Sequence, residues 1–162
     1  MPYVARQTIL DAGMATHGWQ RYWKSGFASQ LNDRLIDALV DGATNFSSPL
    51  SAIAIFPLHG AVLRVAPDAT AFSMRQPVWD CNAIAQWQDP SESETHIAWV
   101  RDLWNKVEPN TLGSAYVNHI SGDDRPEKVR ASFGGNYEKL SALKSKYDPE
   151  NLFHLNPNVR PG

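Results

Sequence analysis

Apolar side chains recur every three or four residues in two long stretches, the spacing that places them on one face of a helix. The stretch from Gln30 to Gly42 has five such positions: Leu31, Leu35, Ile36, Leu39 and Val40. The second stretch follows Asp89-Pro90 and has four: Ile97, Val100, Trp104 and Val107. These patterns predict two amphipathic helices, which Gly42 and Pro109 are expected to end.

Shorter helices are predicted near both ends of the chain. Residues 4–13, VARQTILDAG, predict a helix that ends at Gly13. Arg125-Pro126-Glu127 opens another helix, which Gly134-Gly135 interrupts. The last helix has one apolar face, made of Tyr137, Leu140, Leu143 or Lys144, and Tyr147. The following Asp148-Pro149-Glu150 fits a helix N-cap with proline at the first helical position.

Alternating or continuous apolar runs predict the strands. Two of them are residues 19–27, WQRYWKSGF, and residues 79–87, WDCNAIAQW. Residues 49–67 hold two apolar runs around Pro57-Leu58-His59-Gly60, which predicts a hairpin. Residues 113–121, GSAYVNHIS, predict a further strand. Alternation would place Tyr116 and Asn118 on one of its faces, with Ile120, and Val117 and His119 on the other.

This order of elements predicts an α+β fold, a largely antiparallel sheet with helices packed on one face. The 162 residues are enough for one domain, 1–162, with a core of its own, and we find no repeat or linker. The composition, 43% hydrophobic and 20% charged, is ordinary for a soluble globular protein. The sequence therefore indicates a single folded unit.

Charge and motif content argue against several functions. A net charge of −2 without a Lys/Arg cluster gives no basis for nucleic-acid binding. The lone Cys81 rules out an internal disulfide and is interpreted as a small buried hydrophobe, and no Cys/His spacing indicates a metal site. No apolar run approaches the ~20 residues that span a bilayer, and the N-terminus does not resemble a signal peptide, so a cytoplasmic location is expected.

Polar residues in the predicted strand 113–121 are the first candidates for chemistry. A core strand would hold the adjacent Asn118 and His119 only with partners for both. Two interpretations stay open: a functional pair, or a strand end before the loop at Gly122. His59, in the predicted hairpin turn, could likewise face a ligand as a base or simply be solvated.

Two segments carry a resemblance to a known family. YVNH at residues 116–119 and VRASFGGNYEKLSALKSKYDPENLFHLNPNV at 129–159 resemble the C-terminal signature of the berberine bridge enzyme-like FAD-linked oxidases, in the vanillyl-alcohol-oxidase superfamily. The matching positions are Tyr116, Asn118, Gly135, Asn136, Tyr137, Leu140, Lys144, Tyr147, Asp148, Pro149, Asn151, Phe153 and Asn156. PYVARQTILDAG, RYWKSGF, PLSAIAIFPLHGAV and ATAFSMR are similar to the family's substrate domain. The resemblance thus covers nearly the whole chain, with the signature at about 113–160.

The resemblance implies an FAD-dependent oxidoreductase, in which a base assists hydride transfer from a substrate C–H to the flavin and O₂ is the usual acceptor. This chain would be its substrate-binding part, and the family's FAD-binding domain is absent from it. The chain alone is therefore expected to be inactive and to hold FAD weakly. A separate chain with an FAD domain is a possible partner, and the C-terminal tail is expected to dock on that domain.

The resemblance also implies roles for individual residues. His119 stands where many relatives have Tyr and is the candidate base, with Tyr116 as the second catalytic residue. The other candidates are, for the cofactor, Asn118, Asn151, Phe153 and Asn156 and, for the substrate, His59 and Trp23. Two departures weaken the match: Pro157 replaces a Gln of the tail motif, and His59 replaces a Gly that is free to adopt a positive φ.

An alternative function belongs to a different class. The chain could be a non-catalytic module that kept the fold and binds a small ligand or associates with itself. Without an FAD domain above it, the face around Tyr116, Asn118 and the tail at Asn156 would meet water, so a homodimer that buries this face is expected. Alternatively, the tail from Leu152 onward folds back over its own sheet.

Overall fold

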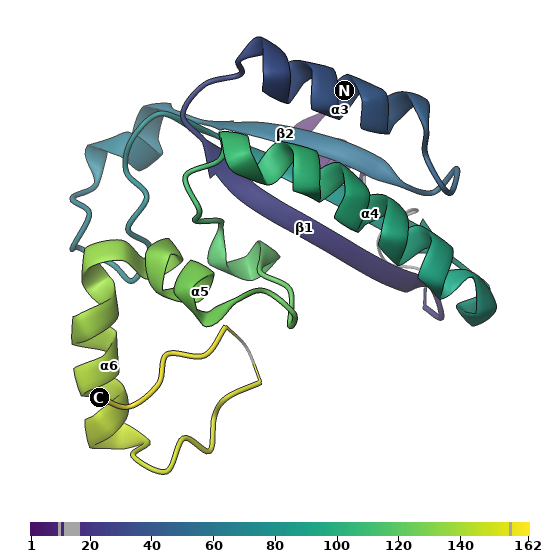
Figure 1. The fold of residues 1–162 in the computed structure, drawn as a ribbon. Coiled ribbons are helices and arrows are strands. Elements are labelled where there is room, and N and C mark those ends of the chain that lie inside the picture. The colour runs from purple at the N-terminus through teal and green to yellow at the C-terminus, as the bar shows by residue number, and fades with distance from the viewer. Residues whose placement is uncertain (10, 12–16, 156) are drawn as a thin grey trace.

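The computed structural model describes residues 1–9, 11, 17–155 and 157–162. An antiparallel sheet of three strands in the order β1-β3-β2 lies at its centre. The strands are β1 (Gln20–Ala28), β2 (Ala52–Leu58) and β3 (Val78–Trp87). Helices α3 (Asp33–Thr44) and α4 (Ser93–Val107) lie along one face of the sheet (Figure 1). The predicted α+β class is confirmed.

The core fills the space between the sheet and these two helices. Alternation along β3 directs every second residue towards them, and these residues are Cys81, Ala83, Ala85 and Trp87. From the helices, Leu35, Leu39, Val100, Leu103 and Trp104 complete the cluster. The intervening positions of β3, among them Asp80 and Asn82, are also buried but belong to the opposite face. That second face therefore carries buried polar side chains.

Gly42 does not end α3, as its position predicted. The helix continues through Gly42 to Thr44, and a Cβ atom at residue 42 would lie only 2.7 Å from Leu103 Cδ2. Glycine is therefore needed here for the close approach of α3 to α4. The helix starts as its sequence suggests, because the Asn32 side chain accepts a hydrogen bond from Leu35 N–H.

The hairpin predicted over residues 49–67 is wrong in its second arm. Its first run forms β2, but the second forms the 3₁₀ turn η1 (Gly60–Arg64), and β2 pairs with β3, with Ile55 opposite Cys81. Every residue of β2 pairs with a residue of the buried strand β3. A short local hairpin would not bury β2 in this way. Gly60 takes the positive φ of +70°, while His59 is extended at φ −154° and therefore unstrained.

The strand predicted over residues 113–121 is also wrong. The segment starts beside the end of β1, where Phe27 N–H donates to Ser114 O (2.8 Å), and then forms the 3₁₀ turn η4 (Val117–His119). A side chain, and not a strand ladder, holds this segment to β1, because Ser25 Oγ donates to His119 O (2.9 Å). In a 3₁₀ turn, residues three apart share a side, so Tyr116 packs against His119, which the predicted alternation had placed on the opposite face.

The terminal helices agree with the sequence more closely. Helix α1 spans Tyr3–Gln7, while the predicted stop at Gly13 lies outside the described residues. Helices α5 (Pro126–Phe133) and α6 (Tyr137–Tyr147) form as predicted, and Gly134 at φ +52° separates them. Both lie beyond one end of the sheet, beside the C-terminal tail (Figure 1). No described helix is long and apolar enough to cross a membrane.

Asp148 ends α6 and does not begin a helix, which corrects the predicted N-cap. Its carboxylate accepts hydrogen bonds from the backbone N–H groups of Leu152 (2.7 Å) and Phe153 (3.1 Å). Lys144, one turn earlier on α6, forms an ion pair with the same carboxylate. These partners, all within five residues of Asp148 in the chain, occupy its carboxylate, so Asp148 shapes the start of the tail.

Candidate active site

His119 and Asp80 form a hydrogen-bonded pair on the face of the sheet opposite α3 and α4. His119 Nδ1 lies 3.1 Å from Asp80 Oδ2, and Asp80 is 4% exposed. An ionised carboxylate only accepts, so Nδ1 of a neutral imidazole carries the hydrogen in this pair. Nε2 of His119 is then an acceptor, and it has no hydrogen-bond partner in the part of the chain that the structure describes. This arrangement suits a proton acceptor.

Aromatic side chains hold the His119 ring on two sides. Trp23 packs edge-to-face at a centroid distance of 5.5 Å, and Tyr116 does so at 5.0 Å. Phe72 in turn packs against Tyr116 at 5.8 Å. Edge-to-face contacts of this kind are favourable and directional. Together with the hydrogen bond to Asp80, they fix the orientation of the imidazole ring.

A cavity of about 520 Å³ opens in front of this pair. Its wall is mainly apolar, with Phe56, Leu58 and Phe72 among the lining side chains, and its polar residues are His59, Asp80, Tyr116 and His119. An apolar wall with a few convergent polar groups is typical of sites for small molecules. The structure therefore brings three predicted residues together, His59, Tyr116 and His119. Trp23 contacts His119 from outside the cavity.

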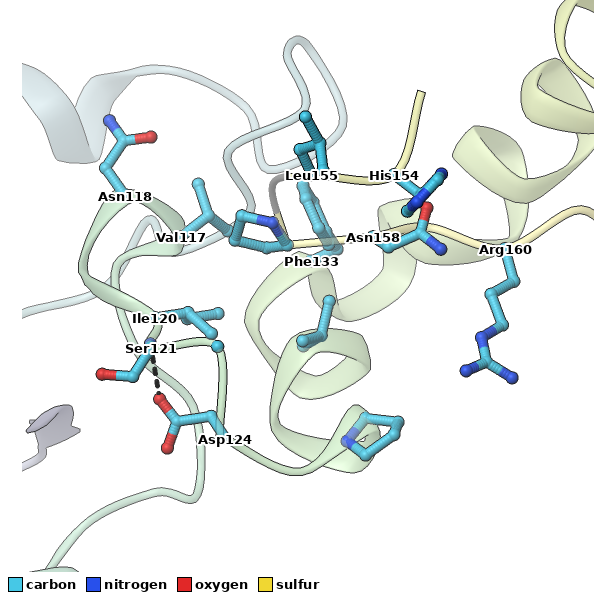
Figure 2. Close-up of a pocket in the computed structure, with 14 residues that line it drawn as sticks. Val117, Asn118, Ile120, Ser121, Asp124, Phe133, His154, Leu155, Asn158 and Arg160 are labelled. Carbon is cyan, nitrogen blue, oxygen red and sulfur yellow. Dashed lines mark hydrogen bonds between the residues drawn. The ribbon is translucent and has the colours of Figure 1, made fainter. Parts of the chain in front are cut away.

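A second cavity, of about 790 Å³, lies between η4, α5 and the C-terminal tail. Figure 2 shows the tail residues His154, Leu155 and Asn158 across this cavity from Val117 and Asn118. The Asn118 amide donates to the Tyr116 hydroxyl (2.8 Å), which lines the first cavity. Turn η4 thus separates the two cavities and contributes side chains to both.

Of the other predicted cofactor residues, Asn151 and Phe153 are not brought together with Asn118. Phe153 is 82% exposed, and neither it nor Asn151 lines either cavity. Asn156 lies outside the described residues. Polar contacts hold the tail along α6: Ser141 Oγ donates to Arg160 O (2.7 Å), and Lys144 Nζ to Phe153 O (2.7 Å). The tail thus does not cover the sheet.

A charged cluster on the opposite side of the sheet anchors the loop that follows η4. Lys24 Nζ lies 2.6 Å from Asp123 Oδ1 and 3.0 Å from Asp124 Oδ1, while Tyr22 and Arg101 also donate to Asp123. Burial opposes the ionisation of Asp123, but the hydrogen bonds from Lys24 and Tyr22 outweigh it and lower the pKa to about 2. This cluster ties the segment after His119 to β1.

Sequence reasoning missed Asp80. The available signal was a carboxylate within WDCNAIAQW, an otherwise apolar strand, because buried charges require partners. The partner, His119, is 39 residues away in the chain, so only the folded structure identifies it. Within the described ranges, no group of three His, Cys, Asp or Glu side chains could hold a metal ion.

Residues 115–160 match the family model described as "Berberine and berberine like". An FAD-linked oxidoreductase of Bacillus subtilis, YgaK, is 35% identical over 104 residues, which are 64% of this chain and 23% of that protein. An FAD-linked oxidoreductase of Dictyostelium discoideum is 27% identical over 163 residues, covering 99% of this chain and 35% of that protein.

Among solved structures, glycopeptide hexose oxidase complexed with teicoplanin is similar, with a TM-score of 0.76 and 28% identity. The match covers 89% of this chain and 33% of that one. The resemblance to berberine bridge enzyme-like FAD-linked oxidoreductases is thus confirmed, and FAD is the cofactor that it implies. The chain spans between 23% and 35% of the length of these relatives.

Proposed function

We propose that this chain, which carries a berberine-like segment at residues 115–160, is the substrate-binding part of an FAD-linked oxidoreductase. The observation that carries the proposal is the place of η4 between two cavities. Its His119 reaches the cavity of about 520 Å³, and its Asn118 reaches the cavity of about 790 Å³. A substrate and a cofactor ring on either side of one short turn would lie close together.

In this proposal His119 is the base. A substrate in the smaller cavity presents a hydroxyl or amine proton to Nε2, and Asp80 stabilises the imidazolium that forms. FAD, when bound, supplies the acceptor for the substrate hydride. Tyr116, held by its contacts with Asn118 and Phe72, orients the substrate.

The larger cavity fits the ring end of a flavin. The side-chain amides of Asn118 and Asn158 offer donors and acceptors for its polar edge, while Val117 and Leu155 offer apolar contact. The phosphates need elements that this chain does not supply, so they would come from an FAD domain, in the same longer protein or in a separate chain. The isolated chain should therefore be inactive.

The test is to produce the chain together with an FAD domain of the same family, fused or as a separate chain. The complex should be yellow with bound flavin, and His119→Ala should lower its turnover by about 10²–10⁴. His17→Ala, which removes an exposed histidine, is the matched control and should leave turnover unchanged. Equal kinetics of both variants would contradict the role of His119.

A second candidate function has its own support. Leu152, Phe153 and Leu155 are 69%, 82% and 95% exposed, and apolar side chains in such numbers are typical of an interface. A non-catalytic module that associates with itself through the tail as a homodimer would use them. Sedimentation at tens of micromolar separates the options, because a monomer contradicts the dimer.

A cytoplasmic location also stays a prediction.

A further inference from the structure

The segment that joins β2 to β3, residues 59–77, forms part of the wall of the cavity of about 520 Å³ without belonging to the sheet. Its Val62 and Phe72 line the cavity, and Phe72 packs against Tyr116 on the other side. Apart from the 3₁₀ turn η1, the segment consists of turns and irregular backbone, so no strand ladder holds it. The position of this wall therefore depends on contacts with other parts of the chain.

Asn136, in the 3₁₀ turn η5 (Gly134–Asn136) between α5 and α6, provides two such contacts. Its buried side-chain amide donates to Pro67 O (2.7 Å) and to Thr70 O (3.0 Å). In the same turn Gly134 lies so close to the segment that a Cβ atom there would be 3.0 Å from Ser73 Oγ. Asn136 is thus a position of the berberine-like signature that anchors the wall of the cavity.

Ser132, near the end of α5, contacts both sides of the cavity wall. Its backbone O accepts a hydrogen bond from Ser73 Oγ (3.2 Å), and its Oγ accepts one from Ala115 N–H (2.9 Å). Ser73 follows Phe72 in the chain, and Ala115 precedes Tyr116. Ser132 is 3% and Ala115 1% exposed, so water offers no ready substitute for the hydrogen bond between them.

We propose that Ser132 and Asn136 are positioning residues, which hold Phe72 against Tyr116 and so set the shape of the cavity. Tyr116 in turn packs against the ring of His119 at a centroid distance of 5.0 Å. Neither Ser132 nor Asn136 lines the cavity, so both act through these aromatic contacts and not on a ligand. The inference rests on the proposed function only in that this cavity is taken as its substrate side.

The test uses two variants of the isolated chain without flavin. Ser132→Ala leaves the buried N–H of Ala115 without its acceptor. Asn136→Asp replaces the amide by a carboxylate, which only accepts at neutral pH, so Pro67 O and Thr70 O lose their donor. Both substitutions nearly keep the size of the side chain, so a change at the cavity follows from the lost hydrogen bonds.

The measurement is the nuclear Overhauser cross-peak between the ring protons of Phe72 and Tyr116, here called the cavity cross-peak. Wild type should show it, and both variants should lose it. The rings of Trp87 and His96, 5.1 Å apart on the other face of the sheet, serve as a reference, and their cross-peak should persist in the folded variants. A wild type without the cavity cross-peak, or a variant that keeps it at wild-type intensity, would overturn the proposal.

Ser48→Ala and Asn45→Asp are the matched controls. The buried Ser48 hydroxyl accepts from Leu50 N–H (3.1 Å), and the Asn45 amide donates to Asp41 O (2.9 Å). Neither residue lines the cavity, so both controls should keep the cavity cross-peak.

Ser73→Ala replaces either test variant that does not fold, because it removes only the hydrogen bond to Ser132 O. It should also weaken the cavity cross-peak, and an unchanged intensity would again overturn the proposal. Because no flavin is present, a completed complex that oxidises nothing would count against the proposed function and not against this inference.

Discussion

Replacing Asp123 by Asn should destabilise the chain, because it removes the charge that Lys24 and Arg101 share. In the folded state the pKa of Asp123 is about 2, against an ordinary value of 3.8. This difference corresponds to about 2.4 kcal/mol of stability at neutral pH. The side chain is 40% exposed, and solvent screening reduces the expected loss to about 1 kcal/mol. In the variant Lys24 keeps Asp124 as a partner, which is a second reason to expect a loss of about 1 kcal/mol.

The pH dependence of this loss follows from the direction in which folding shifts the pKa of Asp123. Folding depresses the pKa of Asp123, so its contribution is complete above 3.8 and disappears as the pH falls through about 2. Near pH 3, about half of the contribution should remain. The difference in unfolding free energy between wild type and Asp123→Asn should therefore shrink by about half between pH 7 and pH 3.

Urea unfolding followed by circular dichroism, at both pH values, measures this difference. Asp41→Asn is the control, because its ion pair with Lys106 is exposed on both sides, so solvent screens it and its removal should cost less than that of Asp123. A loss for Asp123→Asn that is no larger than the control, or one that does not change with pH, would refute the reasoning. Either outcome would mean that solvent screens the cluster completely.

Gly42→Ala should cost about 1–3 kcal/mol in urea unfolding, because its Cβ would overlap Leu103, and adding Leu103→Ala should recover part of that loss. Burial, and then the charge of Asp80, raises the pKa of Cys81 to about 11, so iodoacetamide should label this thiol only in urea; rapid labelling of the native chain would contradict its burial. A titration of the isolated chain with FAD, followed by flavin fluorescence, should give weak or no binding, and a sub-micromolar Kd would contradict this. If sedimentation finds a dimer, deleting residues 152–162 should dissociate it; an intact dimer would place the contact elsewhere.

The sequence by itself determined the elements that depend on local periodicity. The strands β1 and β3 and the helices α3 to α6 form where apolar spacing predicts them, within a few residues. The berberine-like signature was also readable, since its residues lie close together in the chain. From these two sources came the fold class, the cofactor that the resemblance implies, and His119 as a candidate.

Only the tertiary structure decided what depends on distant partners. Residues 60–64 and 117–119 look like strand segments, but β2 pairs with β3, and side chains such as Ser25 hold η4 in its place. A strand needs a neighbour as well as a pattern, and no local rule supplies that neighbour. For the same reason, the sequence alone did not reveal the site. Asp80 could be recognised as part of the site only when folding brought its Oδ2 to 3.1 Å from His119 Nδ1.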